Sequence, residues 1–148
     1  MTIDEAELRA VLDEHSIIRT MHRYCRALDS GSEHEWLDVF TEDATYDTVL
    51  PDGGVYAHLT TRAEFIAFLD AYPRQPVTAP KHVIVDPIIE LYGDVARGES
   101  TFLFLNQAPG EMPRVMAWGR YIDHFRREGD RWRISARLCE TEAVAGDA

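Results

Sequence analysis

The first part of the chain places apolar residues three and four positions apart, which is the spacing of one face of a helix. This spacing predicts an amphipathic helix over residues 4–28. The apolar positions that support it are Leu8, Val11, Leu12, Ile18, Met21, Cys25 and Leu28. A second helix is predicted over residues 33–40, because Ser32 and Glu35 have the spacing of a capping box at a helix start.

After these helices, the pattern changes to short runs with the composition of strands. We predict a strand over residues 44–50 and a partner strand over residues 55–59. Between them, Pro51-Asp52-Gly53-Gly54 has the composition of a hairpin turn. Thr60 or Thr61 is then expected to cap a third helix. The apolar side of that helix contains Phe65, Ile66, Phe68 and Leu69.

The rest of the chain is predicted to consist of strands, because it is rich in β-branched and aromatic residues. The four strands cover residues 82–92, 95–106, 114–127 and 132–142. Helices followed by a run of neighbouring antiparallel strands indicate an α+β fold. We expect the N-terminal helices to pack in the concave face of a strongly curved, mixed or antiparallel sheet. This cone would have a mouth near the end of the first helix, and residues 1–148 would form one domain.

The charge and hydropathy of the chain exclude several classes of protein. The net charge of −11 argues against a nucleic-acid partner, because phosphate binding needs clustered Lys and Arg. No apolar run reaches the length of a membrane span. The acidic N-terminus, Met1 to Glu5, lacks the basic and apolar regions of a secretory signal. We therefore expect a cytoplasmic protein without a membrane partner.

The motifs in the chain predict no cofactor and no metal. Cys25 and Cys139 form no CxxC pair, so neither a disulfide framework nor a zinc knuckle is indicated, and both are expected to be core thiols. His15 and His22 come without a third metal ligand. The sequence also contains no glycine-rich phosphate loop and no nucleophile elbow. The expected partner is a small hydrophobic molecule.

Asp29 closes the predicted first helix, immediately before Ser30 and Gly31. The C-terminus of a helix favours cations, so a carboxylate at that point is mildly unfavourable. One interpretation is that Asp-Ser-Gly is ordinary turn chemistry. The other is that Asp29 points into a pocket, where desolvation would make its carboxylate a better base at neutral pH.

Four motifs carry a resemblance to a known family. They are Tyr24-x4-Asp29, Trp36-x3-Phe40-Thr41-Glu42-Asp43-Ala44, Lys81-His82 at the start of a strand, and Trp132-x4-Arg137. With the order of elements, they resemble the SnoaL-like branch of the nuclear transport factor 2-like superfamily over nearly the whole chain. The combination of Asp29, His82 and Arg137 is similar to the dehydratase and dehydrochlorinase members, among them scytalone dehydratase, the bile-acid dehydratase and the hexachlorocyclohexane dehydrochlorinase.

The resemblance implies an acid–base site inside the cone. It implies that His82 removes a proton, that Asp29 orients His82 and stabilises its charge, and that Arg137 assists electrostatically on the anion side. Tyr24 would be an acid or a hydrogen-bond donor. General chemistry agrees with these roles, because an imidazole titrates near neutrality and a neighbouring carboxylate fixes its tautomer.

Each of these residues also has a structural interpretation. His82 follows a proline-containing loop and could simply begin a strand in solvent. Arg137 could form a buried ion pair with an acid, and Tyr24 lies on the apolar stripe of the first helix. The aromatic residues expected either to line the pocket and bind substrate or to fill the core are Phe40, Tyr46, Phe102, Phe104 and Trp118.

The leading functional hypothesis is a cofactor-independent, dehydratase-like lyase or isomerase that acts on a small apolar cyclic substrate. The alternatives are a polyketide cyclase-like enzyme, which would depend less on His82, and a non-catalytic small-ligand-binding or oligomeric subunit. Fold alone does not choose between these functions.

Leu103 and Leu105 alternate with Phe102 and Phe104, so both faces of one strand are apolar. We therefore expect a homodimer or higher homo-oligomer packed through the sheet.

Overall fold

The computed structural model describes residues 4–146, and its element order matches the predicted one. Met1–Ile3 lie outside the described residues. They belong to the N-terminal stretch that was used above to argue against a secretory signal. The elements are α1 (Glu5–Ser30), α2 (Glu33–Asp38), β1 (Phe40–Val49), β2 (Val55–Leu59), α3 (Arg62–Ala71), β3 (Lys81–Tyr92), β4 (Val95–Asn106), β5 (Arg114–Glu128) and β6 (Arg131–Val144). Within this range no helix is both long enough and apolar enough to cross a membrane.

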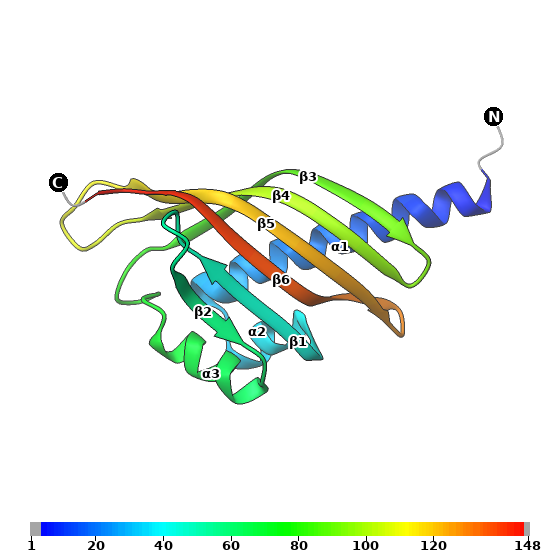
Figure 1. The fold of residues 1–148 in the computed structure, drawn as a ribbon, viewed down its shortest axis with the longest axis horizontal. Helices are drawn as coiled ribbons and strands as arrows, with labels where there is room; N and C mark the ends of the chain where they lie inside the picture. Colours follow the sequence, from blue (N-terminus) through cyan, green and yellow to red (C-terminus); the bar gives the residue numbers. More distant parts are fainter. Residues whose placement is uncertain (1–3, 147–148) are drawn as a thin grey trace.

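All six strands form one sheet in the order β2-β1-β6-β5-β4-β3. Only the contact between β1 and β6 is parallel, and the other neighbours are antiparallel, so the sheet is mixed. The sheet twists across α1, which crosses one of its faces, while α2 and α3 lie on the side of β1 and β2 (Figure 1). This arrangement confirms the predicted α+β class and the packing of helices against a curved sheet.

The second helix is shorter than predicted, and the first strand begins earlier. The helix ends at Asp38, and β1 starts at Phe40 rather than at Ala44. The register between β1 and β6 shifts between Phe40 and Thr45, so the polar Thr-Glu-Asp stretch is accommodated as an irregular part of the strand. Phe40 therefore points into the core from a strand and does not close a helix.

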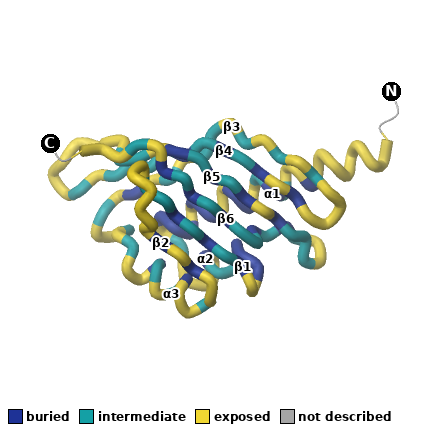
Figure 2. The backbone as a smooth tube through the Cα atoms, viewed as in Figure 1, coloured by how far each residue is buried: buried dark blue, intermediate teal, exposed yellow. Residues whose placement is uncertain are grey.

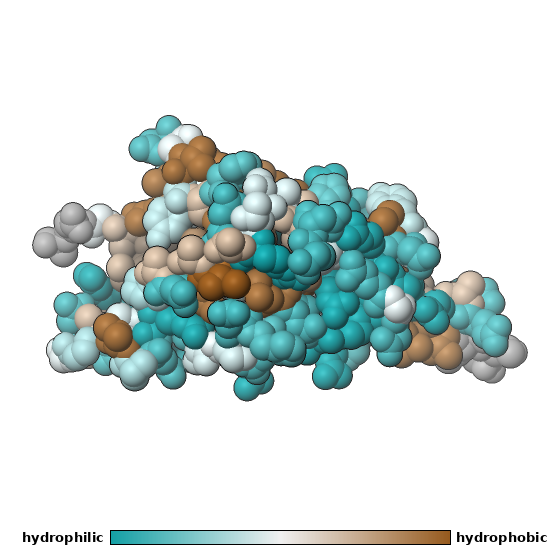
Figure 3. Space-filling view, turned by 90° about the horizontal axis from the view of Figure 1, so that it is seen from below, coloured by the Kyte–Doolittle hydropathy of each residue, from teal (hydrophilic) through white to brown (hydrophobic). Residues whose placement is uncertain are grey.

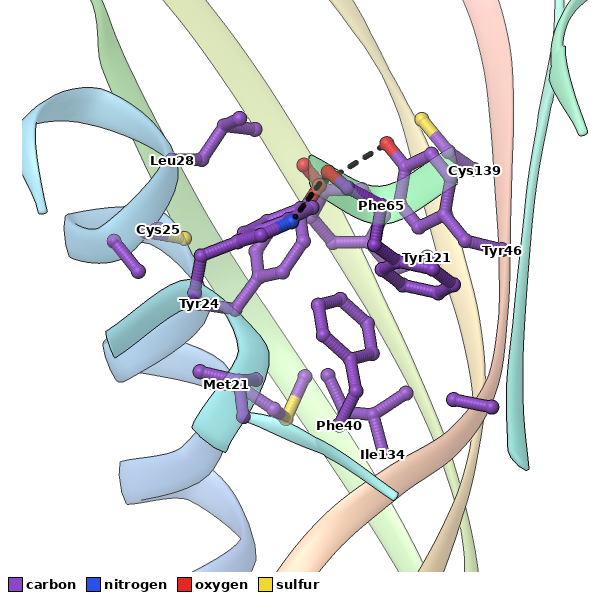
Figure 4. Close-up of a cluster of buried hydrophobic side chains, with 14 of the residues drawn as sticks. Met21, Tyr24, Cys25, Leu28, Phe40, Tyr46, Phe65, Tyr121, Ile134 and Cys139 are labelled. Atoms are coloured by element: carbon purple, nitrogen blue, oxygen red, sulfur yellow. Dashed lines mark hydrogen bonds between the residues drawn. The ribbon is translucent and has the colours of Figure 1, made fainter. Parts of the chain in front are cut away.

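Aromatic rings fill the core between α1 and the sheet. Tyr24, Trp36, Phe40, Phe65 and Tyr121 are all buried, and their rings meet at tilted or edge-on angles that favour aromatic contact (Figure 4). The indole of Trp36 also donates a hydrogen bond to the carbonyl oxygen of Phe65, which joins α2 to α3. This core fixes the direction of α1 across the sheet and therefore the position of the C-terminus of α1.

The first turns of α1 do not contribute to the core. Leu8, Val11 and Leu12, predicted from their spacing to be core positions, are 47 %, 63 % and 55 % exposed. Figure 2 shows this part of the helix as exposed and extending past the end of the sheet. The spacing identified the helix correctly, but the sheet is too short to cover its first three turns, so the buried stripe begins at Asp13 and Ile17.

Asp13 connects α1 to the end of the sheet through a largely buried ion pair with Arg127. Its carboxylate accepts hydrogen bonds from Arg127 at 2.8 and 2.6 Å and from the indole of Trp132 at 3.1 Å. The hydrogen bonds from Arg127 lower the pKa of Asp13 from 3.8 to about 2. Because the folded-state pKa is the lower one, this contribution to stability is fully present above about pH 4 and is lost as the pH falls towards 2.

We expect Asp13→Asn to lower the free energy of unfolding by about 2 kcal/mol at neutral pH and to flatten its decline between pH 4 and pH 2. The measurement is urea denaturation at a series of pH values. Asp70→Asn, at an exposed position of α3, is the control and should leave the pH curve unchanged. An Asp13→Asn variant that keeps the full acid-induced decline would contradict the assignment.

Candidate active site

Asp29 and His82 form a buried pair where the end of α1 meets the start of β3. One carboxylate oxygen of Asp29 lies 2.6 Å from Nδ1 of the His82 ring. Its two oxygens also accept the backbone N–H of His82, at 3.2 and 3.1 Å. Both side chains are 6 % exposed. The expected hydrogen bond is therefore present, and the interpretations of Asp29 as a turn residue and of His82 as a solvated strand start are wrong.

The partners of the His82 ring determine which nitrogen is available as a base. A carboxylate accepts hydrogen bonds, so the proton of the neutral ring is assigned to Nδ1. Nε2 then carries the lone pair, and it lies 3.2 Å from the hydroxyl of Tyr72. The ring stacks on Phe104, its cross-strand neighbour, at a centroid distance of 4.7 Å. These contacts hold the imidazole in one orientation.

The helix end that presents Asp29 is held by Arg74, which the sequence did not predict. The last turn of α1 contains no basic residue of its own. The guanidinium of Arg74 donates to the carbonyl oxygens of Ala27 at 2.9 Å and of Gly31 at 2.6 Å. A cation at this position gives the carbonyl oxygens at the helix end an additional donor and opposes the negative end of the helix dipole. Arg74 thereby compensates for the unfavourable position of Asp29.

A cavity of about 180 Å³ opens beside His82, between α1, α3 and the sheet. Its wall is mainly apolar and aromatic, and its rings are those of Tyr24, Tyr46, Tyr56, Phe68, Tyr72, Phe102, Phe104 and Tyr121. Asp29 does not line it, so the carboxylate lies behind the imidazole. Of the residues predicted to bind substrate, Tyr46 and Phe102 are in the wall. Phe68, Tyr72 and Tyr121 line it as well, although the sequence did not single them out for this role.

A second polar group in the cavity wall consists of Tyr24 and Tyr46. Their hydroxyl oxygens are 3.1 Å apart, and both side chains are buried (Figure 4). Burial raises the pKa of both phenols above the usual value, so they stay protonated at neutral pH. One hydroxyl donates to the other, which leaves one O–H free to donate to a ligand.

Arg137 lies outside the cavity, behind the ring of Tyr24. It donates to Asp123 at 2.7 and 2.6 Å, and both side chains are fully buried. Its guanidinium also lies 3.9 Å from the ring centre of Tyr24 and 4.0 Å from that of Tyr121. Arg137 therefore has no direct contact with the cavity, and a contribution of its charge to the chemistry would have to act through the ring of Tyr24. The buried ion pair, its structural alternative, is what the structure contains.

Two predicted substrate-binding residues lie elsewhere. Phe40 packs in the core at centroid distances of 4.9 Å from Trp36 and 4.8 Å from Phe65, and it does not reach the cavity. Trp118 is 47 % exposed, because it points away from α1 on β5, whereas the preceding Ala117 lines the cavity. Successive residues of a strand face opposite sides of the sheet, so only one of the two can face the cavity.

The cysteines are poor nucleophiles. Cys139 lines the cavity, but burial raises the pKa of its thiol to about 11, and burial raises that of Cys25 to about 12. A thiol with such a pKa stays protonated at neutral pH. Among residues 4–146, no group of three His, Cys, Asp or Glu side chains is close enough to hold a metal ion. The acid–base groups of the cavity wall are thus one imidazole and several phenols, beside the hydroxyls of Thr48 and Thr141.

The model of the SnoaL-like domain family matches residues 9–138. The chain belongs to this SnoaL-like family. No curated protein sequence matches it. Among solved structures, LinA aligns at 16 % identity over 96 % of this SnoaL-like chain and 94 % of its own, with a TM-score of 0.78. A candidate scytalone dehydratase from Novosphingobium aromaticivorans aligns at 19 % identity over 92 % and 88 %, with a TM-score of 0.76.

A third similar structure is the β subunit of a candidate aromatic-ring-hydroxylating dioxygenase from the same organism. It aligns at 18 % identity over 92 % of this SnoaL-like chain and 93 % of its own, with a TM-score of 0.80. At such identities the likeness shows a common fold. Because these neighbours carry different functions in their descriptions, the activity of this chain has to be argued from its own cavity.

Proposed function

We propose that this SnoaL-like protein is a cofactor-independent lyase or isomerase of the dehydratase type, with His82 as its base and Asp29 as the partner of that base. The observation that carries the proposal is the buried His82–Asp29 pair, in which Nδ1 meets the carboxylate and Nε2 meets Tyr72, another residue of the cavity wall. A carboxylate on Nδ1 makes Nε2 a better proton acceptor, because it stabilises the imidazolium that forms.

The proposed reaction begins with a carbonyl compound in the cavity. Nε2 of His82 removes the proton on the carbon next to the carbonyl, and the electron pair of that C–H bond moves towards the carbonyl oxygen. The free O–H of the Tyr24–Tyr46 pair donates to this oxygen and stabilises its developing charge. The resulting enolate either expels a hydroxyl group from the neighbouring carbon, which is dehydration, or is reprotonated at another carbon, which is isomerisation.

The cavity volume limits the substrate to a small molecule. An apolar cavity of about 150 Å³ holds benzene, so the volume of about 180 Å³ fits a molecule with a single ring. The apolar wall favours a neutral substrate, in agreement with the acidic net charge of the chain. We therefore propose six-membered cyclic β-hydroxy ketones as the substrate class.

The position of Asp29 argues against the alternative of a polyketide cyclase-like enzyme. Such an enzyme would use the aspartate itself as the acid–base residue, but here the carboxylate is covered by the His82 ring and does not line the cavity. Binding of an apolar ligand alone does not require a buried imidazole fixed by a carboxylate. Both observations favour the dehydratase proposal over its alternatives.

The test uses the wild-type protein and two small ketones. With 3-hydroxycyclohexanone, we expect formation of the enone, followed by its ultraviolet absorbance. Cyclohexanone has no leaving group. In D₂O we expect the enzyme to catalyse exchange of its α-hydrogens, which NMR measures. A protein that binds these ketones without catalysing either process would contradict the proposal and favour the carrier function.

We also propose that the protein is a homodimer or higher homo-oligomer packed through the outer face of the sheet. Val83, Leu103 and Trp118 are cross-strand neighbours on that face, and Leu105 and Val115 form the next such pair. Val83, Val115 and Trp118 are 39 %, 44 % and 47 % exposed, so the face presents a continuous apolar patch. Seen from below, hydrophilic residues cover the right part of the molecule, while apolar residues gather left of the centre (Figure 3).

We expect light scattering at micromolar concentration to give at least twice the monomer mass of 16.9 kDa. Trp118→Glu should shift the protein to the monomer, because it places a charge at the centre of the patch. The control is Val55→Glu, at a 67 % exposed apolar residue of β2 outside the patch, which should not change the mass. A monomeric wild type would refute this proposal.

A further inference from the structure

Tyr72 is directed into the cavity by the end of α3 and is held from two sides. Helix α3 ends at Ala71, and Tyr72 adopts an extended backbone (φ −72°, ψ 128°) as its C-cap. The Tyr72 ring packs against Phe68 at a centroid distance of 5.5 Å and against Phe104 at 6.3 Å. Two residues later, the chain is anchored to the end of α1 by the hydrogen bonds of Arg74. The position of the Tyr72 side chain is therefore well determined.

The hydroxyl of Tyr72 contacts the nitrogen that the proposed reaction uses as the base. It lies 3.2 Å from Nε2 of His82, and because Nε2 carries the lone pair, the hydroxyl is the donor of this hydrogen bond. Burial raises the pKa of Tyr72, so the phenol is protonated in the resting protein. A proton acceptor and a proton donor thus lie side by side at one point of the cavity wall.

This juxtaposition matches the geometry of a dehydration. When hydrogen and hydroxyl leave from the same face of a ring, the two breaking bonds point in the same direction from neighbouring carbon atoms. An acceptor facing the hydrogen and a donor facing the oxygen must then be adjacent. The Tyr24–Tyr46 pair is not placed for this task, because its two hydroxyls bond to each other and are assigned to the carbonyl oxygen.

We propose that Tyr72 is the acid that protonates the departing hydroxyl group, a role that rests on the proposed dehydratase function. Nε2 of His82 takes the α-proton, and the C–H electron pair becomes the new C=C bond. The C–O bond breaks with its electron pair on oxygen, and the Tyr72 proton joins that oxygen to give water. The Tyr72 phenolate then takes the proton from Nε2, which restores both residues without any external acid or base.

The experiment separates the acid from the base by using two reactions of one protein. Tyr72→Phe keeps the ring and removes the hydroxyl. We expect it to lower the dehydration of 3-hydroxycyclohexanone by about 10²–10⁴-fold, the usual contribution of a general acid. Exchange of the α-hydrogens of cyclohexanone in D₂O uses His82 and the Tyr24–Tyr46 pair but no acid for a leaving group, so we expect it to stay within about threefold of wild type. His82→Ala should abolish both reactions.

Tyr92→Phe is the control, because Tyr92 lies at the end of β3, is 61 % exposed and does not line the cavity. It should leave both rates unchanged. If Tyr72→Phe lowers both rates equally while its melting temperature is that of wild type, or if it lowers neither, Tyr72 is not the acid. If His82→Ala retains exchange, the proposed base is wrong, and this failure is distinct from that of Tyr72.

A second replacement covers the case in which Tyr72→Phe does not fold. Tyr72 replaced by 3-fluorotyrosine keeps the shape and the hydroxyl but makes the phenol a stronger acid. In the proposed relay this replacement changes the rate of dehydration and leaves α-hydrogen exchange as in wild type. Equal rates for both reactions, with and without fluorine, would overturn the proposal.

Discussion

His82→Ala is expected to lower the turnover of an accepted β-hydroxy ketone by about 10²–10⁴-fold while the protein remains folded. The side chain is 6 % exposed, but among residues 4–146 its ring makes two hydrogen bonds, to Asp29 and Tyr72. The replacement should therefore impair proton transfer more than packing. The measurement is the steady-state rate of enone formation, combined with a thermal melt of the variant.

Asp29→Asn is expected to reduce turnover by a similar factor through the tautomer of His82. The asparagine oxygen can still accept the backbone N–H of His82, but the amide NH₂ would then donate to Nδ1. That arrangement stabilises the tautomer with its proton on Nε2, and such a ring has no lone pair facing the cavity. The ¹⁵N NMR signals of the imidazole should show the change of protonated nitrogen directly.

The chain provides a matched control for both variants. His58 and Asp47 form another histidine–aspartate pair on β2 and β1, but their side chains are 64 % and 38 % exposed. His58→Ala should leave turnover at the wild-type level, because this pair has no contact with the cavity. Wild-type turnover by both His82→Ala and Asp29→Asn would eliminate the proposed mechanism. It would favour the cyclase or carrier function instead.

The sequence was sufficient for the order of elements and for the His82–Asp29 pair, but for different reasons. Hydrophobic spacing and turn residues predicted every helix and strand. The pairing of Asp29 with His82 came from the family resemblance, because no spacing rule joins two residues so far apart in the chain. The role of Tyr72 was not predictable from either source, since it depends on where the end of α3 meets the start of β3.

Trp118 shows that residue type alone does not tell which face of a long strand a side chain occupies. Its strand β5 pairs with β6 through an irregular register between Trp118 and Gly119, and with β4 through another between Phe104 and Leu105. Within β5 the alternation is regular, because Ala117, Gly119 and Tyr121 face the inner side and Trp118 faces outward. The irregularities change which residues of β4 and β6 lie opposite them, and these partners cannot be counted from the sequence. Gly119 is required there, because a Cβ at that position would lie 2.1 Å from the carbonyl oxygen of Glu140.

Asp123→Asn is expected to lower the free energy of unfolding by about 3–5 kcal/mol, because it leaves the Arg137 cation buried without its counter-ion. Asp123 and Arg137 are cross-strand partners on β5 and β6, and both side chains have no solvent exposure. The asparagine has nearly the same shape as the aspartate, so the cost is electrostatic. Urea denaturation provides the measurement.

The double replacement Arg137→Met with Asp123→Leu distinguishes a buried charge from a packing defect. Removing both charges leaves apolar side chains of similar volume, so stability should return to within about 1–2 kcal/mol of wild type despite two substitutions. Full recovery is not expected, since the guanidinium also contacts the rings of Tyr24 and Tyr121. If turnover also returns in the double variant, Arg137 supports the cavity only by holding these rings. If stability returns without turnover, its positive charge behind Tyr24 contributes to the chemistry from outside the cavity.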